Sequence, residues 1–140
     1  MAIAQISVFL ENRTGTLNEM TEVLASAGIN LRALTIAEEQ DFGIARLIVD
    51  DTPRALALLR NESYICRITP VLAYAIPDEA GGLNNLLKQF TEANINIKYM
   101  YSSVVESSRA YMVMKASHIE EAEMALEAAG LTSVTEDELK

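Results

Sequence analysis

The sequence has one cysteine, no long apolar run and little positive charge. A single cysteine, Cys66, excludes a disulfide within the chain, and we expect it in a buried strand in a reducing compartment. The 11 basic and 20 acidic residues leave a net charge of −9, which disfavours attraction to nucleic acid or anionic membranes. Residues 1–10 lack a basic leader, and no run approaches the roughly 20 apolar residues of a spanning helix. We therefore predict a cytoplasmic protein with no nucleic-acid or membrane partner.

The sequence also lacks the residue groupings of common catalytic and metal sites. His118 is the one histidine, and without a cysteine or second histidine nearby it cannot form a zinc site or a nucleophilic triad. No phosphate-binding Gly-Lys-Ser/Thr sequence occurs. Asp50 and Asp51 precede Thr52 and Pro53, where negative charge favours a helix start over a metal site. We predict no catalytic residue, metal or cofactor, and hence a protein that is not an enzyme.

What the sequence does contain is an internal repeat. A shift of 66 residues, from Gly15 to Gly81, brings six residues onto identical ones without a gap. The first set is Gly15, Leu17, Asn18, Ala27, Ile29 and Asn30, and the second is Gly81, Leu83, Asn84, Ala93, Ile95 and Asn96. Any function must therefore account for two similar units, which we place at residues 1–69 and 70–140.

In the first copy the apolar spacing predicts the order strand, helix, strand, strand, helix, strand. The expected elements are a strand at 6–10, a helix from Thr16 to Ala27, strands at 29–37 and 42–49, a helix from Thr52 to 61–63, and a strand at 64–69. Thr16 and Glu19 have the spacing of a capping box, and Gly28 supplies a left-handed helix stop. Thr52 is expected as a cap, with Pro53 at the first helical position.

The second copy repeats this order directly after Pro70, which we expect to separate two strands. The expected elements are a strand at 71–76, a helix at 83–93, strands at 95–105 and 110–116, a helix at 119–129 capped by Ser117 and ended by Gly130, and a strand at 131–135. We expect little order beyond Glu136. The predicted fold class is α+β, with two ferredoxin-like βαββαβ units, each an antiparallel four-stranded sheet with two helices on one face.

In each copy one polar loop precedes the first helix. Because a helix N-terminus offers unpaired N–H groups and a positive dipole end, the loops Arg13–Leu17 and Glu79–Leu83 are candidate carboxylate-binding sites. Gly15 and Gly81 let a ligand approach the backbone closely, although they also suit a tight strand-to-helix turn.

An asparagine opens the second strand in both copies. The carboxamides of Asn30 and Asn96 can donate to a carboxylate and accept from an ammonium group, although such an asparagine also caps turns. The recurrence of the loop glycine with the strand asparagine favours the ligand-binding interpretation.

These residues carry a family resemblance. Glu11-Asn12-Arg13-Thr14-Gly15-Thr16-Leu17, followed by Ala27-Gly28-Ile29-Asn30-Leu31, resembles the opening of an ACT domain, in particular the serine-binding regulatory domain of D-3-phosphoglycerate dehydrogenase. The second copy, with Pro77-Asp78-Glu79-Ala80-Gly81-Gly82-Leu83 and Ile95-Asn96-Ile97-Lys98-Tyr99-Met100-Tyr101, is similar to small stand-alone tandem ACT proteins of prokaryotes. The resemblance implies that an amino acid lies between two ACT units, held by the loop and by the asparagine of the second strand.

By this resemblance Asn12, Gly15 and Asn30 would contact the ligand in the first copy. With the two loops and the repeat, the full set of candidate ligand-binding residues also includes Arg13, Thr14, Thr16, Leu17, Asp78, Gly81, Gly82 and Asn96. Leu10 stands where the dehydrogenase family has a histidine, which argues against serine as the ligand. Asp78 replaces the loop asparagine and would repel a nearby carboxylate, although it could pair with an ammonium group. We therefore expect two sites that are not equivalent, and favour the one that uses the loop Asn12–Thr16.

The sequence thus predicts a non-catalytic sensor or regulatory module that binds an amino acid between ACT units. The alternative is a regulatory subunit that docks on an amino-acid biosynthetic enzyme. A homodimer is expected, because open sheets leave edge strands that need cover. A small enzyme is disfavoured because no acid, base or nucleophile is paired, and RNA binding because the chain is acidic and has few aromatic residues.

Overall fold

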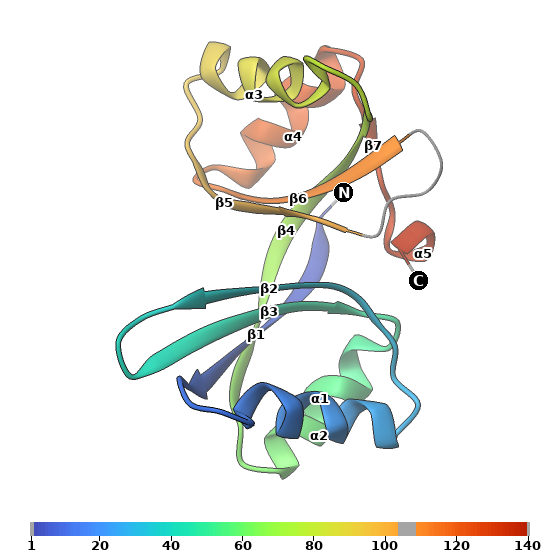
Figure 1. Cartoon of the computed structure of the whole chain (residues 1–140). Helices are drawn as coiled ribbons and strands as arrows, with labels where there is room; N and C mark the ends of the chain where they lie inside the picture. The colour runs from blue at the N-terminus through green and yellow to red at the C-terminus, as the bar shows by residue number, and fades with distance from the viewer. Residues whose placement is uncertain (1, 104–108, 140) are drawn as a thin grey trace. The chain divides into compact units, whose positions relative to one another are not determined.

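The structure, a computed structural model, describes residues 2–103 and 109–139. It divides into two compact units (Figure 1). The N-terminal unit contains Ala4–Thr69, and the C-terminal unit contains Pro70–Leu139 together with residues 2–3. Each unit is described by itself below.

The N-terminal unit is a sheet with two helices on one of its faces (Figure 1). Its elements are β1 (Ile3–Glu11), α1 (Thr16–Ser26), β2 (Leu31–Glu38), β3 (Phe42–Val49), α2 (Thr52–Asn61) and the first part of β4 (Ile65–Pro77). The strand order is β2-β3-β1-β4, and β3 pairs antiparallel with both β1 and β2. This arrangement confirms the predicted α+β, ferredoxin-like fold class.

The C-terminal unit repeats the arrangement. Its elements are the rest of β4, α3 (Gly82–Glu92), β5 (Ile97–Ser102), β6 (Arg109–Ala116), α4 (Ile119–Ala128), β7 (Thr132–Ser133) and α5 (Glu136–Leu139). The strand order is β7-β4-β6-β5, with all three pairings antiparallel. Of the strand predicted at 95–105, residues 104 and 105 lie outside the described residues.

Two predictions about this half of the chain are wrong. Pro70 does not separate two strands, because β4 continues through it; proline loses only one donor and its fixed φ suits extended backbone. The chain is also ordered beyond Glu136, where α5 places Leu139 in a buried position. The prediction rested on the acidic residues of this tail and overlooked the apolar Leu139, whose burial holds the tail in place.

The predicted capping box of α1 is wrong by one position. Gly15 is the N-cap, with φ of +92°, and Thr16 is already helical. The Thr16 hydroxyl donates to the backbone oxygens of Glu11 (2.8 Å) and Arg13 (3.0 Å) instead of accepting from the helix. Thr16 therefore closes the preceding loop, and no side chain among the described residues caps α1.

The predicted caps of α2 and α4 are also displaced. Asp51 caps α2 by accepting from the Arg54 N–H at 3.3 Å, so Thr52 is the first helical residue. In α4 the N-cap is His118, not Ser117. Asp51 and Thr52 are neighbouring residues of similar capping chemistry, whereas His118 holds the cap position of α4 without a side-chain hydrogen bond.

All four long helices end in the same way. A residue with positive φ follows each helix: Gly28 (75°), Ser63 (69°), Asn94 (58°) and Gly130 (77°). The next N–H then donates to a carbonyl five residues back, as Ile29 does to Leu24 at 3.0 Å. The stops predicted at Gly28 and Gly130 are confirmed.

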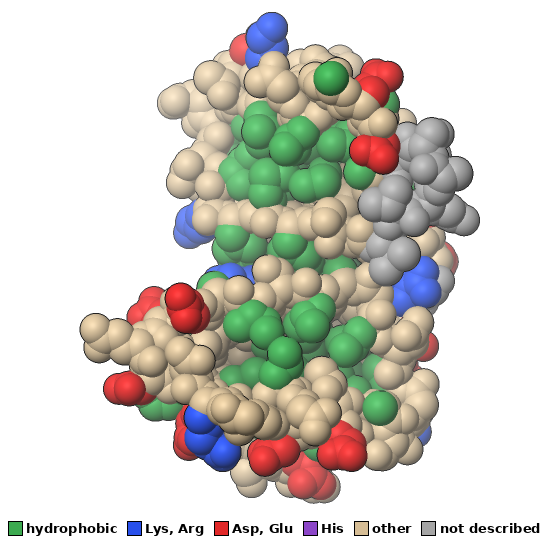
Figure 2. Space-filling model, in the orientation of Figure 1, with side chains coloured by type: hydrophobic (Ala, Val, Ile, Leu, Met, Phe, Trp, Pro, Cys, Tyr) green, Lys and Arg blue, Asp and Glu red, His purple; other side chains and the backbone are tan. Residues whose placement is uncertain are grey.

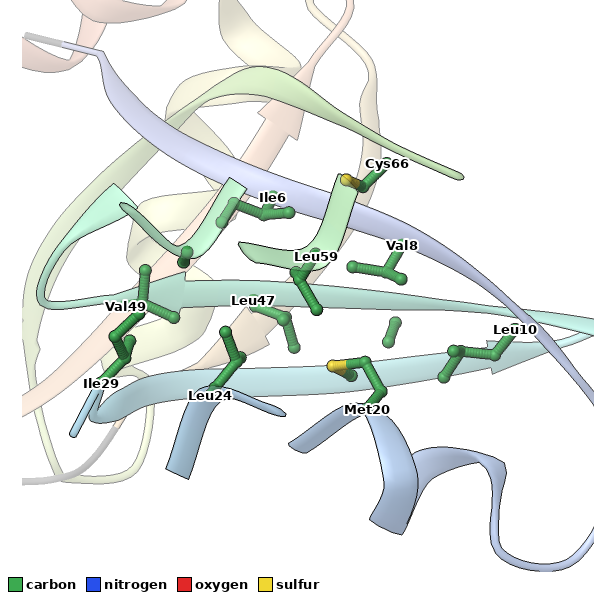
Figure 3. Packing of buried hydrophobic residues seen from close by; sticks show 12 residues of the cluster. Ile6, Val8, Leu10, Met20, Leu24, Ile29, Leu47, Val49, Leu59 and Cys66 are labelled. Atoms are coloured by element: carbon green, nitrogen blue, oxygen red, sulfur yellow. The ribbon is translucent and has the colours of Figure 1, made fainter. Parts of the chain in front are cut away.

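The hydrophobic core of each unit lies between the sheet and its helices. In the N-terminal unit the side chains shown in Figure 3 come from β1, α1, β3, α2 and β4, with Ile29 between α1 and β2. Cys66 lies in this core on β4, as predicted for a buried strand residue. The C-terminal core uses the equivalent positions, for example Leu72 for Ile6 and Leu86 for Met20.

Candidate functional site

The β1–α1 loop is held by its own backbone. The Arg13 N–H donates to the Glu11 oxygen (3.0 Å), the Thr16 N–H to the Arg13 oxygen (3.4 Å) and the Glu19 N–H to the Gly15 oxygen (2.9 Å). Gly15 adopts the left-handed conformation that this turn requires. With no side-chain cap among the described residues, the first turn of α1 presents backbone N–H groups that suit an anion.

The β4–α3 loop repeats this hydrogen-bond pattern. The Glu79 N–H donates to the Pro77 oxygen (2.9 Å), the Gly82 N–H to the Glu79 oxygen (3.1 Å) and the Asn85 N–H to the Gly81 oxygen (2.9 Å). A Cβ atom at Gly82 would lie 2.3 Å from the Pro77 oxygen. Gly82 is therefore required by the turn itself, whatever it does for a ligand.

Asn12 ties the loop to the β2–β3 turn at the same end of the unit (Figure 1). Its N–H donates to the Asp41 oxygen at 2.8 Å, and its side-chain nitrogen donates to the oxygens of Glu39 and Gln40, both at 3.3 Å. These bonds use its amide donors and leave the side-chain oxygen as the group that can accept from a ligand. Asp78, at the equivalent position, has no amide donors.

Asn30 and Asn96 make the same backbone contacts in their units. The Asn30 N–H donates to the Asp50 carboxylate (3.1 Å), and its oxygen accepts from the Asp50 N–H (3.1 Å). The Asn96 N–H likewise donates to the Ser117 hydroxyl (3.1 Å), and its oxygen accepts from the Ser117 N–H (2.8 Å). Both residues are exposed, and these bonds do not use their carboxamides.

The structure does not bring Asn30 to the loop of its own unit. The two lie at opposite ends of α1, whose 11 residues span about 16 Å. Asn30 lines a different hollow, beside Thr21 and Glu22. A single amino acid can therefore contact a loop and a strand asparagine only if they come from two different ACT units.

A pocket of about 270 Å³ opens beside the β1–α1 loop of the N-terminal unit. Four parts of the unit line it: the end of β1, the loop with the first turn of α1, the start of β3, and the α2–β4 connection. The residues are Phe9, Leu10, Glu11, Arg13, Thr16, Glu19, Phe42, Ser63, Tyr64 and Ile65. Of the predicted site residues, Arg13 and Thr16 lie here.

Sequence analysis missed the apolar wall of this pocket. Phe9, Phe42, Tyr64 and Ile65 are far apart in the chain and meet only because β1, β3 and β4 lie near one another in the sheet. Phe42 and Ile65 each stand at the first position of a strand, where they give no distinctive periodic signal. Their exposure, 59% and 72%, is the feature that marks them.

Charged side chains from the end of β1, the loop and α1 line the pocket: Glu11, Arg13 and Glu19. The Arg13 Nε atom lies 2.7 Å from the Glu11 carboxylate, and this hydrogen bond raises the pKa of Arg13. The pKa of the Tyr64 hydroxyl is raised by burial and, to a lesser degree, by the carboxylates of Glu19 and Glu62. The pocket thus has an apolar wall beside groups of both charge signs.

Residues 2–103 and 109–139 contain no group of three or more His, Cys, Asp or Glu side chains placed to hold a metal ion. Within the same residues, every helix is too short or too polar to cross a bilayer.

Comparisons with known proteins agree with the duplicated fold. Residues 1–140 match the model of a family described as ACT domain pair. The solved structure of protein BT0572 from Bacteroides thetaiotaomicron is 36% identical, with a TM-score of 0.94 over 99% of this chain and 96% of that one. The ligand-free regulatory subunit of aspartate kinase from Thermus thermophilus has a TM-score of 0.68 at 16% identity, over 91% and 90% of the two chains, and so shares the fold. A search among curated proteins gave no match.

Proposed function

The chain belongs to the family of ACT domain pairs, and from that premise we propose that it is a non-catalytic sensor of an amino acid. The observation that carries the proposal is the uncapped start of α1, which opens beside the pocket of the N-terminal unit. A carboxylate suits the N–H groups of this first turn and the guanidinium of Arg13. An ammonium group suits the Glu19 carboxylate or the side-chain oxygen of Asn12.

The other predicted residues enter this proposal as supports of the loop or as a second site. Thr14 and Leu17 belong to the loop and the first turn of α1, while Gly81, Gly82 and Asp78 belong to its repeat. Because Asp78 adds a negative charge, the site of the C-terminal unit would hold an ammonium group more readily than a carboxylate. The special likeness of the first copy to the D-3-phosphoglycerate dehydrogenase domain stays a prediction.

A homodimer fits the surface of both units. Leu34 and Ile36, on the outer strand β2, are 39% and 49% exposed, and hydrophobic side chains gather between β2 and α1 (Figure 2). A similar gathering lies between α3 and β5 (Figure 2), with Leu83 exposed on α3. Pairing these faces with a second copy would cover the open strand edges and bring a loop and an asparagine of different units together.

The second candidate function is a subunit that docks on an amino-acid biosynthetic enzyme in the cytoplasm. The aspartate kinase subunit of similar fold is a regulatory subunit of that enzyme. A chain with no catalytic site of its own transmits a signal only if binding shifts an equilibrium in a partner or in its own assembly.

A thermal-shift screen against the twenty amino acids, with the native mass recorded for each hit, tests the proposal. Ligand at a hundredfold excess over Kd adds about 2.7 kcal/mol of apparent stability, which such a scan detects. A selective rise supports the sensor and identifies the ligand class. No rise for a folded protein would contradict the sensor and favour the docking subunit.

Gly15→Val should abolish the ligand-dependent rise with a modest loss of folding stability. The φ of +92° at this position is strongly unfavourable for a β-branched residue, so the loop has to change shape. Gly81→Val, at a φ of +88° in the C-terminal unit, is the matched control and should keep the binding. Unchanged affinity in Gly15→Val would show that this loop is not the site.

A further inference from the structure

We propose that the ligand of the N-terminal unit is an amino acid with a large apolar side chain, an aromatic one above all. This inference rests on the proposed function and identifies the ligand class of that same pocket. It also implies one ligand per chain, because among the described residues the C-terminal unit has Ala75 and Thr132 where the wall has Phe9 and Ile65.

The exposed apolar side chains of the wall carry the inference. Phe9, Phe42 and Ile65 are 38%, 59% and 72% exposed, although large apolar residues are rarely left open together on one surface. Phe42 lies opposite Glu11 in the β1–β3 pairing, two residues along β1 from Phe9, so both rings occupy the same face of the sheet. A ligand with an apolar body would remove this wall from water.

The polar groups of the pocket lie where the backbone of such a ligand needs them. Arg13 lines the pocket and offers positive charge to a carboxylate, and α1 begins beside it without a side-chain cap. Glu19, one turn into α1, offers a carboxylate to an ammonium group, and its field reaches the Tyr64 hydroxyl in the same wall. The charged ends of an amino acid would therefore face the helix while its side chain faces Phe9 and Phe42.

The pocket volume suits one amino acid. Ligand pockets for drug-sized molecules measure roughly 300 to 1,000 Å³, and this one measures about 270 Å³. A small polar side chain such as that of serine would leave most of the aromatic wall exposed to water. Its hydroxyl would also face apolar side chains that offer it no hydrogen bond.

The C-terminal unit has the same backbone frame, but its described residues do not repeat the wall. Ala75 occupies the position equivalent to Phe9. Leu131 occupies the position equivalent to Tyr64, because each directly follows the residue of positive φ that ends the preceding helix. Thr132 follows Leu131 where Ile65 follows Tyr64. The repeat therefore acts as an internal comparison in which the loop backbone is kept, while Phe9 and Ile65 are replaced by Ala75 and Thr132.

Calorimetric titration of the full chain with L-phenylalanine and with L-serine tests the inference, using two variants. Phe42→Ala removes an exposed wall residue, and Met124→Ala, 69% exposed on α4, is the matched control far along the chain. We expect L-phenylalanine to bind at about one per chain and at least about tenfold more tightly than L-serine. Phe42→Ala should weaken L-phenylalanine binding about tenfold, and Met124→Ala should leave it unchanged.

The outcomes separate this inference from the proposed function. If L-serine binds as tightly as L-phenylalanine, or if Phe42→Ala keeps full affinity while Gly15→Val loses it, the apolar ligand class is overturned and the amino-acid sensor stands. If none of the twenty amino acids binds the folded wild-type chain, the sensor and this inference fail together. Retained thermal stability of Phe42→Ala shows that a loss of binding comes from the pocket.

Discussion

The two units share one backbone arrangement but differ in the side chains that it carries. Their cores correspond position by position, with Phe90 for Leu24 on the first helix and Tyr74 for Val8 on the central strand. The volume of the core is thus redistributed while every element keeps its place, as expected where overall packing matters more than individual side chains. The differences that bear on function lie at the ends of the strands and in the loops.

The two loops close in different ways. In the N-terminal unit the Thr16 hydroxyl bridges to the Glu11 oxygen at 2.8 Å. In the C-terminal unit the equivalent Gly82 has no side chain, and the Pro77 oxygen occupies the space that a Cβ atom would need. The first loop thus adds a replaceable side chain to its backbone hydrogen bonds, whereas close backbone packing excludes any side chain at Gly82 in the second.

The largest expected effect on stability is a pH dependence that comes from Tyr74, at the core position where the N-terminal unit has Val8. Its hydroxyl is buried and has no hydrogen-bond partner among the described residues, and burial, with smaller effects of Glu123 and Glu127, raises its pKa to about 12. The unfolded tyrosine ionises near pH 10, so the folded state loses about 2 to 3 kcal/mol of stability as the pH rises from 10 to 12.

Urea unfolding of wild type and Tyr74→Phe at about pH 9 and pH 11.5 measures this effect. The wild type should lose about 2 kcal/mol more than Tyr74→Phe between the two pH values. At neutral pH Tyr74→Phe should be as stable as wild type or up to about 1 kcal/mol more stable, because it removes an unpaired buried hydroxyl. Equal pH dependence of the two proteins would show that the hydroxyl is solvated.

Gly82→Ala should cost about 2 kcal/mol, because its methyl group meets the Pro77 oxygen and the loop has to shift. Thr16→Ala, at the equivalent position, loses only the hydroxyl's hydrogen bonds and should cost about 1 kcal/mol. Thermal unfolding of both variants gives the comparison. A smaller cost for Gly82→Ala than for Thr16→Ala would mean that the second loop adapts freely.

The smallest expected effect distinguishes the ends of α1 and α3. Gly28→Ala should lose about 1 kcal/mol, because an alanine at a φ of +75° is strained. Asn94 occupies the equivalent place at +58°, and Asn94→Gly should change stability by no more than about 0.5 kcal/mol, since asparagine tolerates this conformation and glycine adds unfolded-state entropy. Chemical denaturation measures both, and a loss in Asn94→Gly as large as that in Gly28→Ala would show that the asparagine side chain stabilises the turn.

Local sequence signals predicted the helices and most strands well. The spacing of Met20 and Leu24 and the stop at Gly28 specify α1 without reference to the rest of the chain. The cap of α2 was missed because Asp51 and Thr52 offer similar chemistry one position apart, and those of α1 and α4 because Gly15 and His118 hold the cap position without a side-chain hydrogen bond. The break predicted at Pro70 failed because its backbone fits an extended strand.

The candidate site was predictable only in part. The glycine loops were found because they repeat, but the contacts of Asn12 with the β2–β3 turn join residues 27 and 28 positions apart. No local pattern reports such a contact. The aromatic wall escaped prediction for the same reason, since its members belong to three strands and a helix–strand connection.

By itself the sequence determined a duplicated βαββαβ frame and two glycine loops at helix starts, because periodicity and turn chemistry act over a few residues. The tertiary structure decided which of the loop residues face a pocket, which carboxamide is engaged by the backbone, and that only the N-terminal unit places Phe9 beside Phe42. These features depend on strand order and register, which bring distant residues together and which no short stretch of sequence specifies.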